Sequence, residues 1–221
     1  DSQKNLSITH PILVTSSGNR RRLKLDSQFA SDSIFSNIGE NPNFDDCNSV
    51  IKFCSGKNVD GVIALGGGSV MDLAKVVLAY LSTGETDIID LLEYKGDYER
   101  SISSIFIPTT HGTGSEVTMW GTIWNMSEKK KYSISHMDLY PDIAIIDGNL
   151  TLSLPIDISI ITILDALSHS FEAIWNKNAN ETSTEYAIEA ITIILNNVEL
   201  LKQNLTDINV RNKLLEASTK A

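Results

Sequence analysis

Three consecutive glycines and a serine, residues 66–69, give the clearest chemical signal in the sequence. They follow an apolar run and precede a helical pattern. Glycines leave no side chains between the backbone and a ligand, and the N–H groups and positive dipole end of a helix favour a phosphate. The segment is neither a GxGxxG fingerprint nor a Walker A loop. It predicts a phosphate-binding loop of a different kind, and Asp72 and Lys75 follow it in the helix. The alternative is a tight strand–helix turn that binds no ligand.

A second segment, residues 108–116, is rich in hydroxyl groups and glycine. It begins at Pro108, where an apolar run ends, and contains Thr109, Thr110 and Thr113. Hydroxyl groups can donate hydrogen bonds to phosphate, ribose or carboxamide groups. The segment therefore indicates a second set of contacts to a nucleotide. The alternative is a polar loop that Ser115 caps before a helix.

Asp165 and His169 could bind a metal ion. They lie four residues apart in a helical pattern, which places both side chains on one face, with their Cβ atoms about 5–6 Å apart. A carboxylate and an imidazole there can approach one divalent metal from two directions. A surface Asp–His pair has the same spacing. Two ligands are too few for a metal site, and no histidine follows His169.

Other polar residues carry weaker signals. His111 and His136 could act as ligands or bases, but simple hydrogen bonding in loops is the more common role. Three lysines at 129–131 are typical of a solvated hairpin, although one of them could reach a nucleotide. Residues 175–180, which are rich in asparagine, could end a helix or line a polar pocket.

The hydrophobic pattern indicates elements that would position these residues. Short apolar runs predict buried strands, and longer periodic segments predict helices. The strands are expected over residues 11–15, 61–65, 102–107 and 143–146, and the helices over 45–56, 70–82, 158–176, 182–204 and 207–220. Alternation of strands and helices in the first part predicts an α/β fold with a parallel sheet.

The pattern changes near residue 155. From about residue 158 onward it is helical, and no glycine or proline occurs there. We expect a dinucleotide-binding α/β domain over residues 1–155 and the start of an all-α, metal-binding domain over 156–221. Roughly 65 helical residues bury little on their own. We therefore expect the helical domain to be incomplete and the chain to be a piece of a longer protein.

Composition and charge exclude several classes of partner. The 221 residues include 18 Lys and Arg against 28 Asp and Glu, a formal net charge of −10. This balance argues against nucleic-acid binding, which needs a basic face, and against docking on an anionic membrane. No apolar run reaches the ~18–20 residues of a membrane span. Two cysteines without a CxxC pattern are expected to be reduced thiols in a cytoplasmic protein.

The segments described above resemble the iron-containing (group III) alcohol dehydrogenases. Residues 66–75, GGGSVMDLAK, are similar to that family's GGGSxxDxAK signature, and residues 107–116, IPTTHGTGSE, to its IPTTxGTGSE segment. Residues 141–147 and 165–169 match later blocks in the same order. The resemblance covers about residues 58–200.

The resemblance implies a Rossmann-like domain, a helical domain and a metal–nicotinamide site in the cleft between them. It implies NAD(P) and a divalent metal, Fe²⁺ or Zn²⁺, as cofactors, with a homodimer as the plausible assembly. Asp165 and His169 would be the first two metal ligands; the family's other two are histidines in later helices, which this sequence does not contain. The dinucleotide-binding residues would be Gly67, Gly68, Ser69, Asp72, Thr109, Thr110, Thr113 and Lys131.

Ser16 departs from the common pattern of the family. Members that use NAD often carry an Asp at this position, and an Asp would bond the ribose 2′-OH and repel a 2′-phosphate. Ser16, with arginines at 20–22 close by, could accept NADP. We therefore include Ser16 among the candidate cofactor-binding residues.

The implied activity is hydride transfer between a nicotinamide and a small alcohol or aldehyde. Residues 131–133 and 175–180 are similar to segments of the phosphonoacetaldehyde reductases, which makes phosphonoacetaldehyde one candidate substrate. Three alternatives stay open: a glycerol-dehydrogenase-like enzyme using zinc, a dehydroquinate-synthase-like enzyme using NAD transiently, and a non-catalytic nucleotide-binding module. If the chain is whole, we expect it to be inactive or nearly so.

Overall fold

A computed structural model of the chain describes residues 3, 6–99 and 102–221. Two compact units divide the chain: residues 1–107 with 115–145, and residues 108–114 with 146–221. The sequence predicts a domain boundary near residue 155. In this division by compactness, residues 108–114 and 146–155 belong to the second unit. The functional assignment of the two parts stays a prediction.

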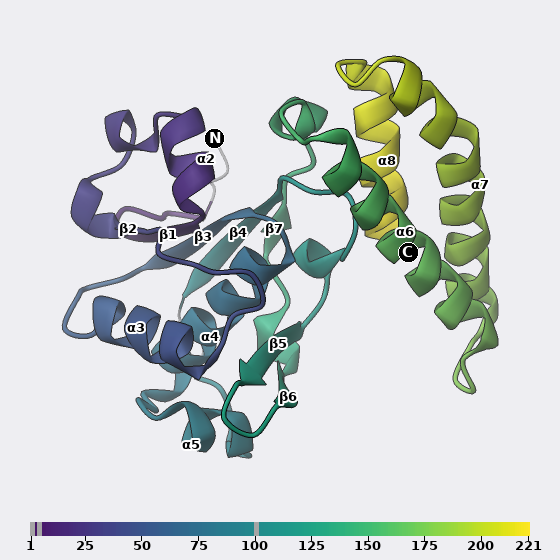
Figure 1. Ribbon diagram of the computed structural model, residues 1–221. Helices are drawn as coiled ribbons and strands as arrows, with labels where there is room; N and C mark the ends of the chain where they lie inside the picture. The colour runs from purple at the N-terminus through teal and green to yellow at the C-terminus, as the bar shows by residue number, and fades with distance from the viewer. Residues whose placement is uncertain (1–2, 4–5, 100–101) are drawn as a thin grey trace. The chain divides into compact units, whose positions relative to one another are not determined.

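The first unit is built on a five-stranded sheet with the order β2-β1-β3-β4-β7 (Figure 1). β1 pairs in parallel with β2 and with β3, and β4 pairs in parallel with β7. The predicted α/β fold class with a parallel sheet is thereby confirmed, and β2 is a strand that the sequence did not predict. The strands are β1 (Pro11–Thr15), β2 (Ile34–Phe35), β3 (Gly61–Gly66), β4 (Ser103–Pro108) and β7 (Ile143–Ala144).

Both faces of the sheet are buried, as the continuous apolar runs predict. Alternate residues of a strand point to opposite faces, so Ile12 and Val14 join one core cluster and Leu13 joins another. The helices α3 (Phe44–Cys54) and α4 (Gly68–Thr83) contribute side chains to the cluster of Ile12 and Val14. This packing fixes the strand ends from which the candidate loops emerge.

Local sequence signals explain where these helices begin and end. Asn43 caps α3 in a capping box with Asp46, and each bond satisfies an amide that the helix leaves unpaired. α4 ends at Gly84, whose φ of 77° is readily adopted only by glycine. The shorter elements are α2 (Ser17–Arg22), α5 (Ile88–Glu93), and the 3₁₀ turns η1 (Leu25–Ser27), η2 (Ser31–Ser33), η3 (Ser115–Val117), η4 (Met137–Leu139) and η5 (Gly148–Thr151).

A separate antiparallel hairpin completes the first unit. β5 (Trp120–Asn125) pairs with β6 (Lys130–Ser135), and Trp124 lies opposite Lys131. The turn between the strands places Lys129 at a φ of 51°. The side chain of Asn125 accepts hydrogen bonds from the amides of Ser127 and Glu128. The lysine run therefore lies in a hairpin, one of the two interpretations of its sequence.

A buried lysine of α4 forms hydrogen bonds to this hairpin and to the loop that precedes it. The ammonium of Lys75 donates to the carbonyl and hydroxyl oxygens of Ser115 at 2.9 and 2.8 Å. It also contacts the hydroxyl of Thr118 at 3.0 Å and the carbonyl of Trp120 at 2.6 Å. The Ser115 hydroxyl donates in turn to Asp72 at 3.3 Å. Burial lowers the pKa of Lys75 to about 8, although the negative charge of Asp72 opposes this shift.

Both cysteines lie in α3 as free, buried thiols. Burial raises the pKa of Cys54 to about 12, and it also raises the pKa of Cys47. Thiols in this state are poor nucleophiles and poor metal ligands. The expectation of two reduced thiols on one helix matches this placement.

Three helices form most of the second unit. They are α6 (Ile156–Trp175), α7 (Glu181–Gln203) and α8 (Ile208–Lys220), each within two residues of its expected bounds. Their shared core includes Ile163, Ala190, Ile194 and Leu214. Several large apolar side chains of this unit stay exposed: Ile158, Ile161, Leu164, Phe171 and Trp175 on α6, and Tyr186, Ile188, Leu195 and Leu200 on α7.

Among the helices of the described residues, α6 alone is long and apolar enough to cross a membrane. Its most apolar window has a mean hydropathy of 1.2, and 22% of that window is buried. The helix also carries Asp165 and His169, and one such helix is weak evidence for a span. The finding qualifies the expectation from sequence that no segment reaches the length of a span.

We expect Lys75→Met to destabilise the first unit by about 3 kcal/mol, because it leaves the Asp72 carboxylate and several buried oxygens without a cation. Urea unfolding followed by circular dichroism measures this change. Lys202→Met is the matched control, since Lys202 pairs with Glu199 on an exposed face of α7. Adding Asp72→Asn should recover part of the lost stability. A loss no greater than that of the control would contradict the proposed role of Lys75.

Candidate functional site

The glycine loop lies at the carboxyl edge of the parallel sheet, between β3 and α4. Gly66 is buried, and a Cβ atom there would approach the side chain of Val70 to 2.5 Å. Gly67 is the N-cap of α4, and no side chain caps the helix there. The first amides of a helix have no carbonyl partner within it, so this end of α4 can hold an anion. Gly67, Gly68 and Ser69 are half-buried and stay accessible.

A second segment borders the same loop. The amide of Asn41 donates to the hydroxyl of Ser69 at 3.1 Å, so the connection before α3 lies against the start of α4. This contact holds the Ser69 hydroxyl at the first turn of α4. It leaves the Ser69 hydroxyl hydrogen able to donate to a phosphate oxygen.

Ser16 lies on the same edge of the sheet. The parallel register pairs Thr15 with Leu65, so Ser16 and Gly66 leave neighbouring strands at the same level. The Ser16 hydroxyl accepts a hydrogen bond from the amide of Asn19 at 3.1 Å and caps α2. The structure thus brings Ser16 and the glycine loop together, although the two are 50 residues apart in sequence.

Arg20 and Arg22, which follow Ser16, have partners of their own. Arg20 forms a bidentate ion pair with Asp26 and also donates a hydrogen bond to the hydroxyl of Ser36. Arg22 donates to the side chain of Asn19 at 2.9 Å. Selection of a 2′-phosphate would therefore depend more on the small, neutral Ser16 than on Arg20.

Asp72 contacts groups inside the first unit. It accepts hydrogen bonds from the Ser115 hydroxyl and from the amide of Thr122, and burial raises its pKa to about 6. These contacts belong to the Lys75 network described above. Asp72 therefore has hydrogen-bond partners within the protein. Its assignment as a cofactor-binding residue stays a prediction.

Lys131 projects from β6 onto the neighbouring strand. Its ammonium lies over the ring of Trp124, 4.9 Å from the ring centroid. Contacts of this kind hold a cation loosely when it is exposed, and Lys131 is exposed. The lysine can therefore leave Trp124 to meet a phosphate or ribose, as its predicted role requires.

The hydroxyl-rich loop, residues 108–114, belongs to the second unit. Thr109 is buried, Thr110 is half-buried and Thr113 is exposed. Gly112 packs against α6, because a Cβ atom on it would lie 2.9 Å from the carbonyl oxygen of Thr162 and 3.3 Å from a carboxylate oxygen of Asp165. The structure thus places this loop beside the helix turn that carries Asp165.

His111 is fully buried within this loop. Its Nδ1 atom lies 3.2 Å from the hydroxyl of Thr162, and its Nε2 atom lies 3.1 Å from a guanidinium nitrogen of Arg211. Burial and the charge of Arg211 lower the pKa of His111 to about 4. His111 is therefore a neutral hydrogen-bonding residue, which agrees with the more common of the two roles weighed from sequence.

Arg211 is a residue that the sequence analysis missed. It lies on α8 among the buried residues Val210, Leu214 and Leu215, and it is itself fully buried. The sequence did contain a signal for Arg211, because a cation lies there on the apolar face of an amphipathic helix. Its partner in the loop is 100 residues away in sequence.

Asp165 and His169 face each other on α6. An Asp165 carboxylate oxygen lies 3.8 Å from Nε2 of His169, and both side chains are somewhat more than 40% exposed. A carboxylate and an imidazole suit Fe²⁺ or Zn²⁺, so the pair fits as two ligands of such a metal. Across the described ranges no group of three or more His, Cys, Asp or Glu side chains could hold a metal. The pair therefore provides part of a ligand set.

Residues 175–180 end one helix and begin the next. The side chain of Asn176 accepts a hydrogen bond from the amide of Asn178, and Asn180 caps α7 in a capping box with Ser183. Trp175 stacks on Phe171 and stays exposed. The asparagines thus act as helix stop and helix start, which is the simpler of the two roles considered from sequence.

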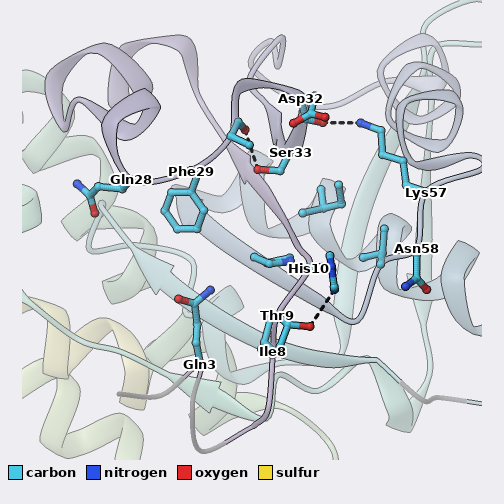
Figure 2. A pocket seen from close by; sticks show the side chains of 14 residues that line it. Gln3, Ile8, Thr9, His10, Gln28, Phe29, Asp32, Ser33, Lys57 and Asn58 are labelled. Atoms are coloured by element: carbon cyan, nitrogen blue, oxygen red, sulfur yellow. Dashed lines mark hydrogen bonds between the residues drawn. The ribbon is translucent and has the colours of Figure 1, made fainter.

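A cavity of about 680 Å³ lies at the opposite edge of the sheet (Figure 2). The segments that precede β1, β2 and β3 line it, and they contribute His10, Phe29 and Lys57. The ammonium of Lys57 donates to the backbone carbonyl of Asp32. Because the strands are parallel, these segments mark the amino edge, away from the glycine loop at the carboxyl edge. The cavity is distinct from the candidate cofactor site.

Comparisons with known proteins show the family to which the sequence is similar. The sequence matches the family described as iron-containing alcohol dehydrogenase over residues 2–148. It matches the C-terminal part of the Fe-containing alcohol dehydrogenase family over residues 159–221. An aldehyde-alcohol dehydrogenase of Streptococcus pneumoniae is 33% identical over 196 residues, covering 84% of this chain and 22% of that protein.

Two solved structures share the fold. A sulfoacetaldehyde reductase from Bifidobacterium kashiwanohense in complex with NAD⁺ superposes with a TM-score of 0.86 and 26% identity, covering 100% of this chain and 60% of that one. An NADH-dependent butanol dehydrogenase from Thermotoga maritima gives 0.85 and 27%, covering 98% and 56%. The chain thus spans less than two thirds of each of these relatives. It belongs to the iron-containing alcohol dehydrogenase family.

Proposed function

We propose that this chain binds the dinucleotide and supplies the first metal ligands of an NAD(P)-dependent alcohol dehydrogenase. The enzyme would transfer hydride between the nicotinamide and the carbinol or carbonyl carbon of a small alcohol or aldehyde. The uncapped start of α4 behind the glycine loop carries this proposal, because it offers unpaired amides at the carboxyl edge of a parallel sheet. A relative solved with NAD⁺ and another described as NADH-dependent support the choice of cofactor.

Each candidate residue has a separate task in this proposal. Gly67, Gly68 and Ser69 bind the pyrophosphate through backbone amides and one hydroxyl. The hydroxyls of Thr109, Thr110 and Thr113, together with Lys131, bind the ribose and carboxamide parts of the dinucleotide. These contacts orient the nicotinamide, whose chemistry belongs to the cofactor.

Asp165 and His169 would hold two positions of an Fe²⁺ or Zn²⁺ ion. When bound, such an ion supplies a Lewis acid that stabilises negative charge on the substrate oxygen. The carboxylate of Asp165 would add the negative charge that favours a divalent cation, and the imidazole of His169 would add a nitrogen donor. In the oxidation direction, the alcohol would lose a proton from its oxygen to solvent and a hydride from its carbinol carbon to the bound NAD(P)⁺.

The location, the assembly and the substrate are proposed mainly from the sequence and its resemblance to the family. We propose a cytoplasmic location and a homodimer, and the two free, buried cysteines accord with a reducing compartment. Phosphonoacetaldehyde remains a candidate substrate, and the sulfoacetaldehyde reductase among the solved relatives acts on an aldehyde that also carries an anionic group. An aldehyde screen with NADH and NADPH on the enzyme decides the substrate.

We expect Gly67→Asp to weaken NADH binding by at least about tenfold. A carboxylate at the start of the helix would accept hydrogen bonds from the free amides and repel the pyrophosphate. Gly67 has φ near −86°, so an Asp fits this backbone, and as an N-cap it should preserve or raise stability. Fluorescence titration with NADH measures binding, and thermal unfolding measures stability.

Asn178→Asp adds the same charge at an exposed turn of the second unit and should leave NADH affinity unchanged. Equal affinities of Gly67→Asp and the unaltered chain would rule out the glycine loop as the pyrophosphate site. NADH binding without turnover in a full-length enzyme that contains metal would instead favour the non-catalytic nucleotide-binding module.

Ser16→Asp tests the choice between NAD and NADP. The substituted carboxylate can still cap α2, so the helix should persist while the 2′-phosphate is repelled. We expect the ratio of NADPH to NADH affinity to fall by about tenfold, measured by titration with each cofactor. Ser17→Asp places the same charge one residue later on an exposed position and should change the ratio less. An unaltered ratio in Ser16→Asp would refute this role of Ser16.

The metal-binding part is tested by titration of the chain with Zn²⁺ after treatment with EDTA. We expect Asp165→Asn to weaken Zn²⁺ binding by about tenfold, because it removes the anionic ligand. Asp157→Asn removes an exposed carboxylate from the first turn of the same helix and serves as the control. The assignment fails if both variants bind Zn²⁺ as tightly as the unaltered chain.

A further inference from the structure

Arg211 is fully buried, and its described hydrogen bonds all go to neutral acceptors. One nitrogen, Nη1, contacts Nε2 of His111 at 3.1 Å and donates to the hydroxyl of Ser159 at 2.8 Å. The other two nitrogens, Nη2 and Nε, donate to the backbone carbonyls of Leu154 and Leu205 at 3.3 and 2.9 Å. A buried cation is costly unless its donors are satisfied. The guanidinium therefore holds these four segments at fixed positions.

The direction of each hydrogen bond follows from Arg211. A guanidinium has donors and no acceptor, so Nε2 of His111 must accept and the ring proton must lie on Nδ1. Nδ1 then donates to the hydroxyl of Thr162 at 3.2 Å, and that hydroxyl donates to the carbonyl of Ser159 at 3.1 Å. The chain of bonds leaves His111 one orientation and one tautomer.

The orientation of His111 sets the path of its loop. Thr110 and Gly112 are its neighbours in the chain, and Gly112 lies in close contact with Thr162 and Asp165. Gly114 approaches the backbone carbonyl of Ser218 on α8 and adopts a φ of 59°. The loop is therefore fastened to α6 and α8 at three successive points, and between them it presents Thr113 to solvent.

We infer that Arg211, through His111, is a positioning residue that orients the threonine loop for the dinucleotide. The inference rests on the proposed function for the identity of the ligand. The same bonds also place the loop backbone against the turn of α6 that carries Asp165. Loss of the Arg211–His111 contact should let the loop open locally while the helices of the second unit remain packed, because their shared apolar core is separate from this contact.

Two substitutions of His111 distinguish a positioning role from a role in packing alone. The amide of His111→Gln can accept from Arg211 where Nε2 does, whereas His111→Ala removes the acceptor. Hydrogen exchange of the loop amides and fluorescence titration with NADH are measured on each variant, with thermal unfolding as a check on folding. Arg211→Lys keeps the charge but lacks the fork of donors, and Lys213→Met removes an exposed cation from α8 as the control.

We expect His111→Ala and Arg211→Lys to speed exchange in residues 109–113 and to weaken NADH binding, each about three- to tenfold. His111→Gln and Lys213→Met should resemble the unaltered chain. Unchanged loop exchange and NADH affinity in a folded His111→Ala variant would overturn the inference, as would equal losses in the Gln and Ala variants. If the unaltered chain binds no NADH, the proposed function falls, and the exchange rates alone decide whether Arg211 positions the loop.

Discussion

The amides at the start of α4 impose the main constraint on this protein. A helix cannot satisfy its own first N–H groups, and here the N-cap is a glycine with no side chain to do so. The packing of Gly66 against Val70 brings the strand and the helix too close for a side chain at that glycine. The result is a short turn whose exposed polar groups suit a phosphate better than they suit another part of the chain.

Buried cations position the other loops. In the first unit, Lys75 holds the segment around Ser115 and the start of the hairpin; in the second, Arg211 holds the loop of His111. Both use backbone carbonyls and hydroxyls as acceptors, and these are groups that a loop always has available. A single long side chain thus organises a segment that has no regular hydrogen bonding of its own, at the cost of burying a charge.

The two units differ in how much apolar surface they bury. The sheet of the first unit is covered on both faces, so every residue of β3 is buried. The three helices of the second unit leave a series of large apolar side chains on α6 and α7 exposed. The length and the apolar composition of α6 explain why it meets the criteria of a membrane span, although Asp165 and His169 lie on the same helix.

Apolar periodicity, glycines and caps were sufficient to predict the parallel sheet, its main helices and the helical second part, because these signals act over a few residues. They missed β2 and α2, which are too short to show a period. The glycine loop, the Asp165–His169 pair and the threonines could likewise be named from local spacing.

The contacts between distant residues were set by tertiary structure alone. Ser16 lies level with the glycine loop because parallel pairing aligns two strands, and His111 meets Arg211 because α8 packs beside the loop. The protonation of His111 follows from that burial. The sequence by itself determined the main strands and helices and indicated the candidate site residues, since both depend on neighbours along the chain. Partners, burial and pKa values depend on neighbours in space, and only the fold decides those.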